Sequence, residues 1–437
     1  MGENFLERHF RLSEHGTSVK KEFVGGLVTF MTMAYIIVIN PAILEAAGMP
    51  FGPAMAATIL SAIFGTVIMG IYANRPFAIA PYMGENAFVA YTVCGVLGYS
   101  WQTALGAVFI SGVLLTILTL TKSRNIMAEA VPYNLKVSFA VGIGMFITFI
   151  GLVNSKIVVL GTADAPLHIG QVTSPEVLIA VIGFLIIAAL MIRKVKGAIL
   201  IGILASALLA FATGVAKAPT EIVSMPPDVS QVFLQLDVMG ALSWGFFAVI
   251  LTMFTMDFLD TMGTLIGASA KAGFLDENGN LPEIEKPFLA DSLATVFGAV
   301  AGTTTTGTFV ESASGIEAGG RTGLCALFIA GFFALGLFFS PLFAAIPAAA
   351  TGPALIIVGI MMMSAVKDLD FEDYAEAIPA FAVIVLMSFT YNMGVGLCAG
   401  FVLFPLLKIV QGKVHDVKPA AWVLFLLCLA FFIFYPY

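Results

Sequence analysis

Charged residues are scarce in this chain of 437 residues. Only 11% of the residues are Asp, Glu, Lys or Arg, whereas 59% are hydrophobic. A soluble domain usually has about a quarter charged residues, so this chain has too little polar surface to cover a water-soluble globule. The short alternating strands of a membrane barrel are missing as well. We therefore expect a bundle of helices solvated by a lipid bilayer.

Histidine and cysteine are also rare, and their positions argue against two kinds of chemistry. The four histidines lie in predicted loops or tails, so no imidazole relay crosses the membrane: His9, His15, His168 and His415. The four cysteines lie singly inside apolar runs: Cys94, Cys325, Cys398 and Cys428. They offer neither a disulfide framework nor the spacing of a metal site. We expect no metal, no cofactor and no enzymatic activity, and any transported proton must use acidic side chains.

Long apolar runs define the expected topology. About 20 apolar residues cross the hydrocarbon as a helix, and counting apolar segments gives fourteen plausible spans, of which 377–391 and 393–411 are short enough to form one bent element. They lie near 24–44, 53–73, 78–97, 104–122, 136–153, 174–192, 197–213, 243–267, 288–301, 303–319, 322–346, 352–366, 377–391 and 393–411. A fifteenth apolar stretch, 420–437, either takes the C-terminus across the membrane or lies along the interface. With a cytoplasmic N-terminus, every Lys and Arg except Lys156 and Lys217 falls on a cytoplasmic segment, which favours that orientation in the plasma or inner membrane.

Two of these segments are broken in the middle. Segment 77–91 carries Pro81 and Gly84 within apolar sequence, and segment 302–320 is rich in threonine and glycine. Irregular backbone at membrane depth is tolerated only inside protein or beside a water-filled cavity. The two segments occupy the third place in the first and in the second seven spans. Corresponding broken segments in two halves are typical of an inverted-repeat transporter with its site between the repeats.

The expected fold class is therefore an all-α polytopic membrane protein of about 14 segments in two inverted repeats of seven. The expected parts are a cytoplasmic N-terminal segment, a first repeat, an extracellular connection, a second repeat and a C-terminal segment with the extra apolar stretch. Their ranges are 1–22, 23–213, 214–242, 243–411 and 412–437.

Two aspartates lie on one otherwise apolar segment. Asp257 and Asp260 are three residues apart, which places both on roughly one face of a helix. A carboxylate at such depth is a functional candidate, because it needs pairing, hydration or protonation. The alternative is a helix end that reaches the headgroups.

The broken segments carry the other candidates. Glu311 follows the threonine run in the second one, and Asn86 follows Gly84 and Glu85 in the first. If each begins a half-helix, the exposed N–H groups there favour a carboxylate or a polarised ligand atom. The alternative for all three side chains is capping of the broken backbone. Burial disfavours the charged form of an acid, so the candidates for proton coupling are Asp257, Asp260, Glu311 and Glu85.

Four motifs together carry a specific resemblance. They are TFMTMAYIIVINPAIL (29–44), APYMGENAFVAY (80–91), MDFLDTMGTLIG (256–267) and TTTTGTFVESASGIEAGGRTGL (303–324). In this order, and over essentially the whole chain, the sequence resembles the AzgA-like adenine/guanine/hypoxanthine permeases, relatives of the nucleobase-ascorbate transporters. The resemblance implies proton symport of purine bases. It also implies a core domain of spans 1–4 and 8–11, a gate domain of spans 5–7 and 12–14, and third and tenth segments that are half strand and half helix.

The resemblance also implies site residues. Asp257, Glu311 and Asn86 would hold the base, and Gly84 and Asp260 would shape or support the site. A purine presents N–H donors and ring-nitrogen acceptors on a flat edge, which carboxylates and an amide can match. Aromatic side chains available to stack on the ring are Phe30, Phe254 and Phe309.

Two departures from the family pattern leave specificity open. Glu85 stands where relatives usually carry an apolar residue, and the stretch 305–309 reads TTGTF instead of a version with valine and tyrosine. The expected partners are a purine nucleobase and protons, with no nucleic acid. The preferred base, the proton number and the oligomeric state, a homodimer included, stay open.

Rival hypotheses fit the residues less well. An anion carrier on the same fold would need a positive or dipole-lined site, whereas this site is acidic. An intramembrane aspartyl enzyme needs its aspartates on separate facing helices, and here Asp257 and Asp260 share one. A channel would leave the paired broken segments without a purpose.

Overall fold

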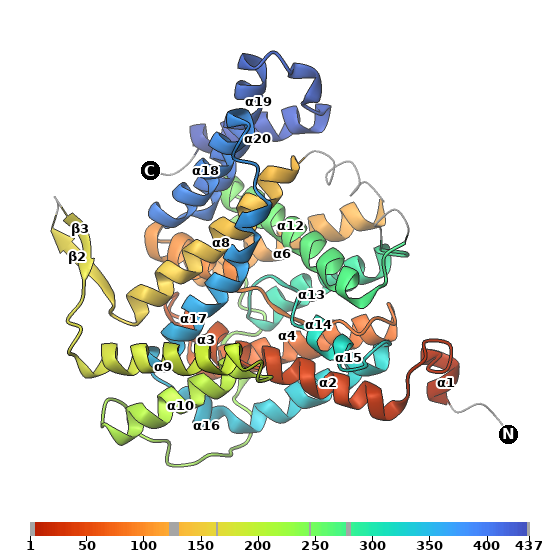
Figure 1. Cartoon of the computed structure of the whole chain (residues 1–437), viewed down its shortest axis with the longest axis vertical. Coiled ribbons are helices and arrows are strands. Elements are labelled where there is room, and N and C mark those ends of the chain that lie inside the picture. Colours follow the sequence, from red (N-terminus) through yellow and green to blue (C-terminus); the bar gives the residue numbers. More distant parts are fainter. Residues whose placement is uncertain (1–4, 122–130, 163–164, 244–245, 277–280, 435–437) are drawn as a thin grey trace.

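Helices dominate the computed structural model, which describes residues 5–121, 131–162, 165–243, 246–276 and 281–434. Within those ranges, nine helical stretches are long and apolar enough to cross a membrane. Shorter apolar helices run over 198–212, 374–389 and 419–433. Figure 1 shows the helices gathered around a common centre, with one hairpin of strands projecting to the side.

The first half of the chain contains the following elements: α1 (Phe5–Phe10), α2 (Val19–Met33), α3 (Ile36–Glu45), α4 (Phe51–Ile71), β1 (Ile79–Pro81), α5 (Met83–Ala87), the π-helix η1 (Phe88–Val96), α6 (Trp101–Leu120), α8 (Tyr133–Asn154), β2 (Val158–Thr162), β3 (Ala165–Ile169), α9 (Pro175–Ile192) and α10 (Ala198–Ala212).

The second half contains η2 (Val229–Gln231), α11 (Val238–Ala241), α12 (Phe247–Ala272), α13 (Glu285–Ala301), β4 (Thr306–Thr308), α14 (Ser312–Glu317), α15 (Gly323–Gly336), η4 (Leu337–Phe339), α16 (Ser340–Ala344), α17 (Ala348–Met363), η5 (Ser364–Asp368), α18 (Tyr374–Phe389), α19 (Met393–Val410), η6 (Val414–Asp416) and α20 (Pro419–Phe434).

Each predicted span coincides with a helix, with consecutive helices or with a strand–helix unit; 24–44 falls on α2 and α3, and 322–346 on α15, η4 and α16. The third span is β1 followed by α5 and η1, and the tenth is β4 followed by α14. The prediction that these two segments are part strand and part helix is confirmed. The fifteenth apolar stretch forms α20.

The helix ends follow ordinary capping chemistry. Ser18, Ser100 and Ser174 each accept a hydrogen bond from the backbone N–H three residues ahead, at the starts of α2, α6 and α9. Gly273 and Gly302 end α12 and α13 with φ angles of 69° and 98°. A side chain there would be strained, which is why glycine terminates these helices.

The two short strands pair with each other in the interior. β1 and β4 are antiparallel, with Ala80 opposite Gly307 in the register. Side chains satisfy the outer edges of this pair: Thr66 Oγ1 accepts from the Ile79 N–H at 2.9 Å, and an Asp291 oxygen accepts from the Thr308 N–H at 3.0 Å. Buried backbone donors need such partners, so these side chains allow strand backbone to exist at membrane depth.

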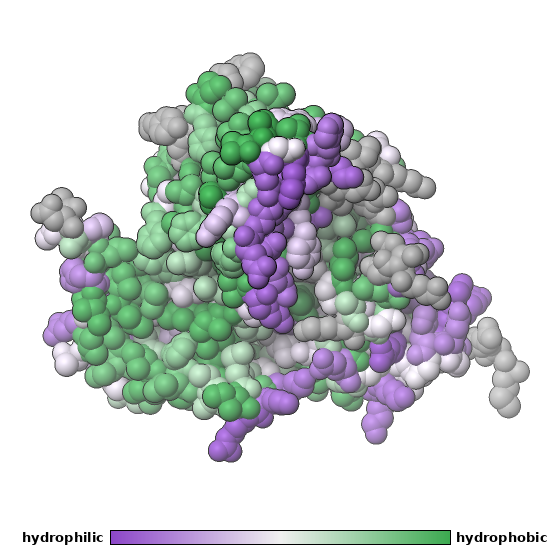
Figure 2. All heavy atoms as spheres, turned by 45° about the horizontal axis from the view of Figure 1, so that its top comes forward, coloured by the Kyte–Doolittle hydropathy of each residue, from purple (hydrophilic) through white to green (hydrophobic). Residues whose placement is uncertain are grey.

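The helices pack in two groups. In the first, α4 packs against α3, α13 and α15, while α6 packs against α12 and α13. In the second, α8 packs against α17 and α18, α9 packs against α10 and α17, and α18 packs against α19. These groups correspond to the spans expected in the core and in the gate, and we use those two names for them. Figure 2 shows a largely apolar surface crossed by a hydrophilic strip.

Glycines bring α8 and α17 of the gate close together. A Cβ added to Gly144 would lie 2.7 Å from the carbonyl oxygen of Gly359, and one added to Gly151 would lie 2.7 Å from that of Gly352. The two pairs are one heptad apart on antiparallel helices, so small residues form a continuous contact line. Membrane helices approach closely where such residues face each other.

Candidate functional site

A small cavity lies where the core meets the gate. Its volume is about 110 Å³, and its wall includes Gly84 and Asp260 of the core together with Val358 and Met362 of α17 in the gate. Pockets for drug-sized ligands measure roughly 300 to 1,000 Å³, so this cavity suits a much smaller solute.

Two acids face this cavity. Asp260 reaches it from α12, and Glu311 reaches it from the turn between β4 and α14. The Tyr35 hydroxyl donates a hydrogen bond of 2.6 Å to Glu311 Oε1. No Lys, Arg or His is among the described residues that form the wall. The cavity is therefore an acceptor-rich site that favours a ligand with N–H donors.

Two aromatic rings form flat walls of the cavity. Tyr82 and Phe309 lie almost parallel, with an interplanar angle of 7° and ring centroids 6.2 Å apart. The backbone fixes both, because Tyr82 N donates to Thr305 O and Phe309 N donates to Ala78 O, each at 2.9 Å. The strand pair thus positions the rings. The other aromatic candidates lie elsewhere: Phe30 packs against Phe332 and Phe333, and Phe254 packs within a separate apolar cluster.

Asp257 is directed toward α13. Its side chain is fully buried and accepts hydrogen bonds from Thr295 at 3.1 Å and from Thr261 at 3.4 Å. It does not form part of the cavity wall. In this conformation the cavity-facing acid of α12 is Asp260, and Asp257 lies behind it.

Asn86 belongs to a buried polar network. Its amide donates to Asn40 Oδ1 and accepts from the Thr304 hydroxyl. The Asn40 amide in turn donates to Thr58 Oγ1 at 2.6 Å and to Thr303 Oγ1 at 2.9 Å. The network ties α3, α4 and α5 to the start of the second broken segment, and it leaves Asn86 outside the cavity wall.

Glu85 and Gly84 lie side by side in sequence with different environments. Gly84 forms part of the cavity wall, and a Cβ there would lie 2.8 Å from Ile143 Cγ2 of α8. Glu85 is fully buried, and its carboxylate meets that of Asp260 and accepts from no donor of another described residue. The backbone contact of the Glu85 side chain is with its own N–H.

Sequence reasoning missed three residues of this region. Tyr35 and Tyr82 lie inside the quoted motifs, where their hydroxyls were the available signal. Asp291 is a buried acid on α13, and its carboxylate accepts from Thr308 N at 3.0 Å and from Thr308 Oγ1 at 2.8 Å. The criterion that selected Asp257, an acid inside an apolar helix, would have found Asp291 as well.

A second cavity adjoins the first. Its volume is about 340 Å³, and it shares Val310 and Glu311 with the smaller cavity. Its far wall is the connection between α9 and α10, which carries Lys194 and Lys196. Glu311 therefore borders both spaces, and the small cavity is approached from the α9–α10 side.

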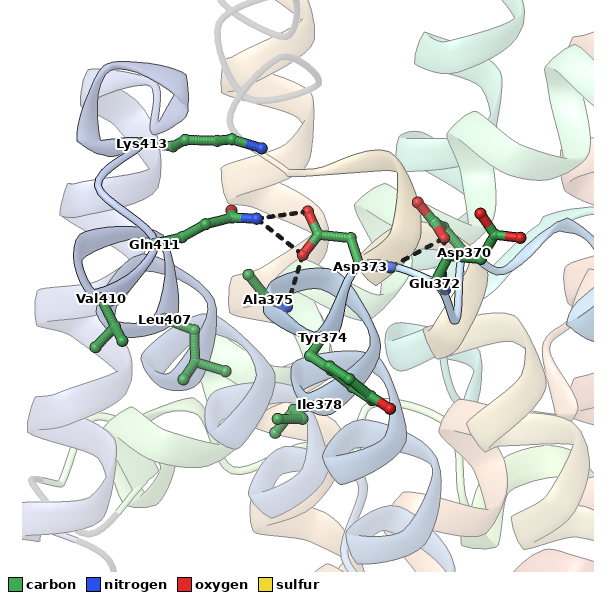
Figure 3. A pocket seen from close by; sticks show the side chains of 10 residues that line it. All are labelled: Asp370, Glu372, Asp373, Tyr374, Ala375, Ile378, Leu407, Val410, Gln411 and Lys413. Atoms are coloured by element: carbon green, nitrogen blue, oxygen red, sulfur yellow. Dashed lines mark hydrogen bonds between the residues drawn. The ribbon is translucent and has the colours of Figure 1, made fainter.

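A larger groove on the surface has a different character. It measures about 700 Å³ and lies between the start of α18 and the end of α19 (Figure 3). Gln411 donates to both Asp373 oxygens at 3.0 and 3.1 Å, and the Ala375 N–H donates at 2.9 Å. These bonds, that from Gln411 first, hold the pKa of Asp373 below its ordinary value. The groove shares no wall residue with the acidic cavity, and its polar groups serve to join two helix ends.

Comparison with known proteins decides the family. A family model described as a permease family matches residues 20–412. The chain belongs to that family. Among its relatives in this permease family, a guanine/hypoxanthine permease of Bacillus subtilis, PbuO, is 43% identical over 94% of this chain and 96% of its own length. An adenine permease of Escherichia coli, AdeP, is 38% identical over 98% of this chain and 95% of its own.

Another relative and a solved structure extend this picture. A protein of Methanocaldococcus jannaschii described only as a permease is 46% identical over 99% of this chain and 98% of its own length. The transmembrane domain of a cyanobacterial bicarbonate transporter, BicA, matches with a TM-score of 0.65 at 17% identity, over 87% of this chain and 97% of that chain. These matches confirm the resemblance to nucleobase permeases and the fold of two inverted repeats arranged as core and gate. The permease is a multi-pass membrane transporter and not an enzyme.

Proposed function

We propose that this permease imports purine nucleobases together with protons, by movement of the core against the gate around the bound base. The observation that carries the proposal is the small cavity between core and gate, with two acids and two parallel aromatic rings in its wall. The names of the relatives, which specify guanine, hypoxanthine and adenine, support the same substrate class.

The wall chemistry fits a flat base. Asp260 and Glu311 are acceptors for the N–H groups on the edge of a purine. Phe309 and Tyr82 offer faces on which its ring can stack, and offset stacking of aromatic rings is favourable by about 0.5–1.5 kcal/mol beyond burial. Asp257 and Asn86, which we expected to touch the base, act in this proposal from behind the wall, by fixing α12 and the broken segments.

The surroundings fit an alternating-access cycle. The wall combines residues of the core and of the gate, so that a relative shift of the two would open or close it. The second cavity leads from Glu311 to the lysines of the α9–α10 connection. Basic connections favour the cytoplasmic side, so the cavity is open inward and the N-terminus is cytoplasmic in this proposal. The repeats are 23–213 and 243–411, joined by an extracellular connection, 214–242.

An anion carrier is the rival function on this fold. The likeness to the bicarbonate transporter is one of fold, at 17% identity. An anion needs positive charge or free N–H donors at its site, whereas the cavity wall carries two acids and, within the described residues, no basic side chain. The site therefore opposes an anion.

The experiment is uptake of radiolabelled adenine, guanine and hypoxanthine, with uracil and xanthine beside them, in cells that lack their own purine permeases. We expect accumulation of at least one of the three purines, and its loss with a protonophore. Glu311→Gln should lower uptake at least about tenfold, because a charge-assisted hydrogen bond to the base is lost. Glu176→Gln, a surface acid paired with Lys156, is the matched control and should behave as wild type. Failure to accumulate any purine, or accumulation that ignores the protonophore, would refute the proposal.

A further inference from the structure

Glu85 is a fully buried acid whose carboxylate accepts from no donor of another described residue and whose side chain meets the carboxylate of Asp260 instead. It lies on α5, directly after the cavity-wall residue Gly84, and its side chain has no exposed surface. It thus lies immediately behind the wall, hidden from the cavity. Buried carboxylates nearly always accept from a donor, so a carboxylate whose side-chain contact is a second carboxylate calls for an explanation.

The charges that act on Glu85 are acidic. They belong to Asp260 and Asp257, both on α12, with Asp260 the stronger of the two. The other elements that pack against α5 are α3, α8 and η1, and no titratable group of theirs, in the part of the chain described here, acts on Glu85. Two adjacent carboxylates without a counter-cation in a water-poor interior do not both carry charge. The pair Glu85 and Asp260 therefore binds a proton when a ligand fills the cavity and excludes water, and it can lose that proton when the open cavity is hydrated.

Asp260 has a second neighbour, which is the cavity itself. It is a wall residue, whereas Glu85 is not. A ligand N–H in the cavity can donate to Asp260, and such a bond is strongest when Asp260 is the charged member of the pair. The proton bound by the pair then resides on Glu85. Ligand binding at Asp260 and protonation of Glu85 are in this way linked, and linkage of this kind is reciprocal.

We propose that Glu85 carries the co-transported proton, as the hidden partner of the cavity acid Asp260. This inference rests on the proposed function of purine import with protons. The proton comes from the outer aqueous phase and forms an O–H bond with a Glu85 carboxylate oxygen as the base binds. When the base leaves inward, water enters the open cavity and hydrates Asp260, so that the charged pair is tolerated and the Glu85 proton passes to the cytoplasmic water.

The test uses purified protein in liposomes with an entrapped pH-sensitive dye and radiolabelled base. In wild type, base entry should acidify the lumen, and an inward proton gradient should drive accumulation. Glu85→Gln should keep base-for-base exchange at the wild-type rate but lose the acidification, and accumulation should fall to simple equilibration. Glu85→Asp should recover acidification, and Glu176→Gln should match wild type throughout.

A binding measurement separates coupling from mere structural damage. In wild type, base affinity should fall by up to about tenfold for each unit of rising pH, as uptake of one proton requires. In Glu85→Gln the affinity should be the same across that range. Infrared difference spectra of the wild type should show growth of a protonated carboxyl band when base is added, with a shifted band in Glu85→Asp. The infrared measurement does not depend on a variant that lacks the acid.

The outcomes separate the two proposals. If Glu85→Gln acidifies the lumen in the wild-type ratio, or if no carboxyl band grows in the wild type, Glu85 is not the proton carrier and purine import stands. If the wild type moves no purine at all, the proposed function fails, and the inference fails with it.

Discussion

At the scale of the residue, the buried acids differ in what stabilises them. Asp291 accepts a backbone and a hydroxyl hydrogen bond from Thr308, and Asp257 accepts from two threonine hydroxyls. Glu311 accepts from the Tyr35 hydroxyl, and Glu85 lies against the Asp260 carboxylate. Acids that accept from two donors of neighbouring elements brace those elements, whereas acids in the cavity wall or beside another acid can exchange partners in this proposal. We propose that this difference separates structural from functional carboxylates here.

The two aspartates of α12 should therefore respond differently to amidation. Asp260→Asn should weaken base binding by about 10- to 100-fold, because hydrogen bonds to a charged group contribute about 1.5–3 kcal/mol. Asp257→Asn should weaken binding much less, because its partners are Thr295 and Thr261. Equilibrium binding of radiolabelled base to the purified variants measures both effects. A larger loss in Asp257→Asn would show that Asp257 turns to the base when it binds.

At the scale of the element, the strand pair β1–β4 is the part that fixes the site. It sets the positions of Tyr82 and Phe309 through backbone bonds at both of its ends. Its outer edges depend on single side chains from neighbouring helices, Thr66 of α4 and Asp291 of α13. Strands this short have no stability of their own, so the helices that surround them determine their geometry.

Loss of the Asp291 carboxylate should disturb this element. Asp291→Ala leaves the buried Thr308 N–H without its acceptor, which should lower the free energy of unfolding by about 1–3 kcal/mol. Base affinity should fall too, because Phe309 follows Thr308 directly. Thermal unfolding of detergent-solubilised protein, with and without base, measures the two effects. Asp228→Ala, an exposed acid of the connection 214–242, is the control, and an equal loss there would contradict this explanation.

The glycine line between α8 and α17 should be intolerant of even one methyl group. Gly144→Ala would place a Cβ 2.7 Å from the Gly359 carbonyl oxygen. The helices must then move apart, at a cost of about 1–3 kcal/mol for an overpacked contact. Gly331→Ala in α15 has open space around its Cβ and serves as the control. Comparison of their thermal unfolding midpoints checks the effect; equal midpoints would mean that the gate adjusts freely.

At the scale of the whole molecule, two bodies meet at the cavity and touch again at the α9–α10 connection. There Lys196 of the gate lies 4.0 Å from Glu317 of the core, with both side chains about half exposed or more. An exposed pair of this kind contributes little to stability. The pair shows where core and gate approach each other, on the side from which the cavity is reached.

Fixing that approach should stop transport. The double variant Lys196→Cys with Glu317→Cys, joined by a short thiol-specific bifunctional reagent, should lose uptake, because core and gate can no longer shift. Reduction of a cleavable cross-link should restore it. Each single variant treated with the same reagent is the control for reaction at the native cysteines. Full uptake by the cross-linked protein would contradict a moving core.

The sequence by itself determined that lipid surrounds the protein, where the spans lie and which two segments are broken. Apolar length and the placement of proline, glycine and threonine are properties of consecutive residues, so they can be read without knowing any contact. The strand–helix character of both broken segments also followed, because the resemblance supplied it and irregular backbone must lie inside the protein.

Only the tertiary structure decided which acid meets the cavity. Asp257 and Asp260 share a helix face and are separated by only about 60° around the axis. Until the position of α13 is known, the sequence does not say which of them points to the cavity and which to α13. The partners that distinguish them, such as Thr295 for Asp257, lie far along the chain. The pairing of Glu85 with Asp260 likewise joins segments far apart in the chain, and no single segment of sequence contains that information.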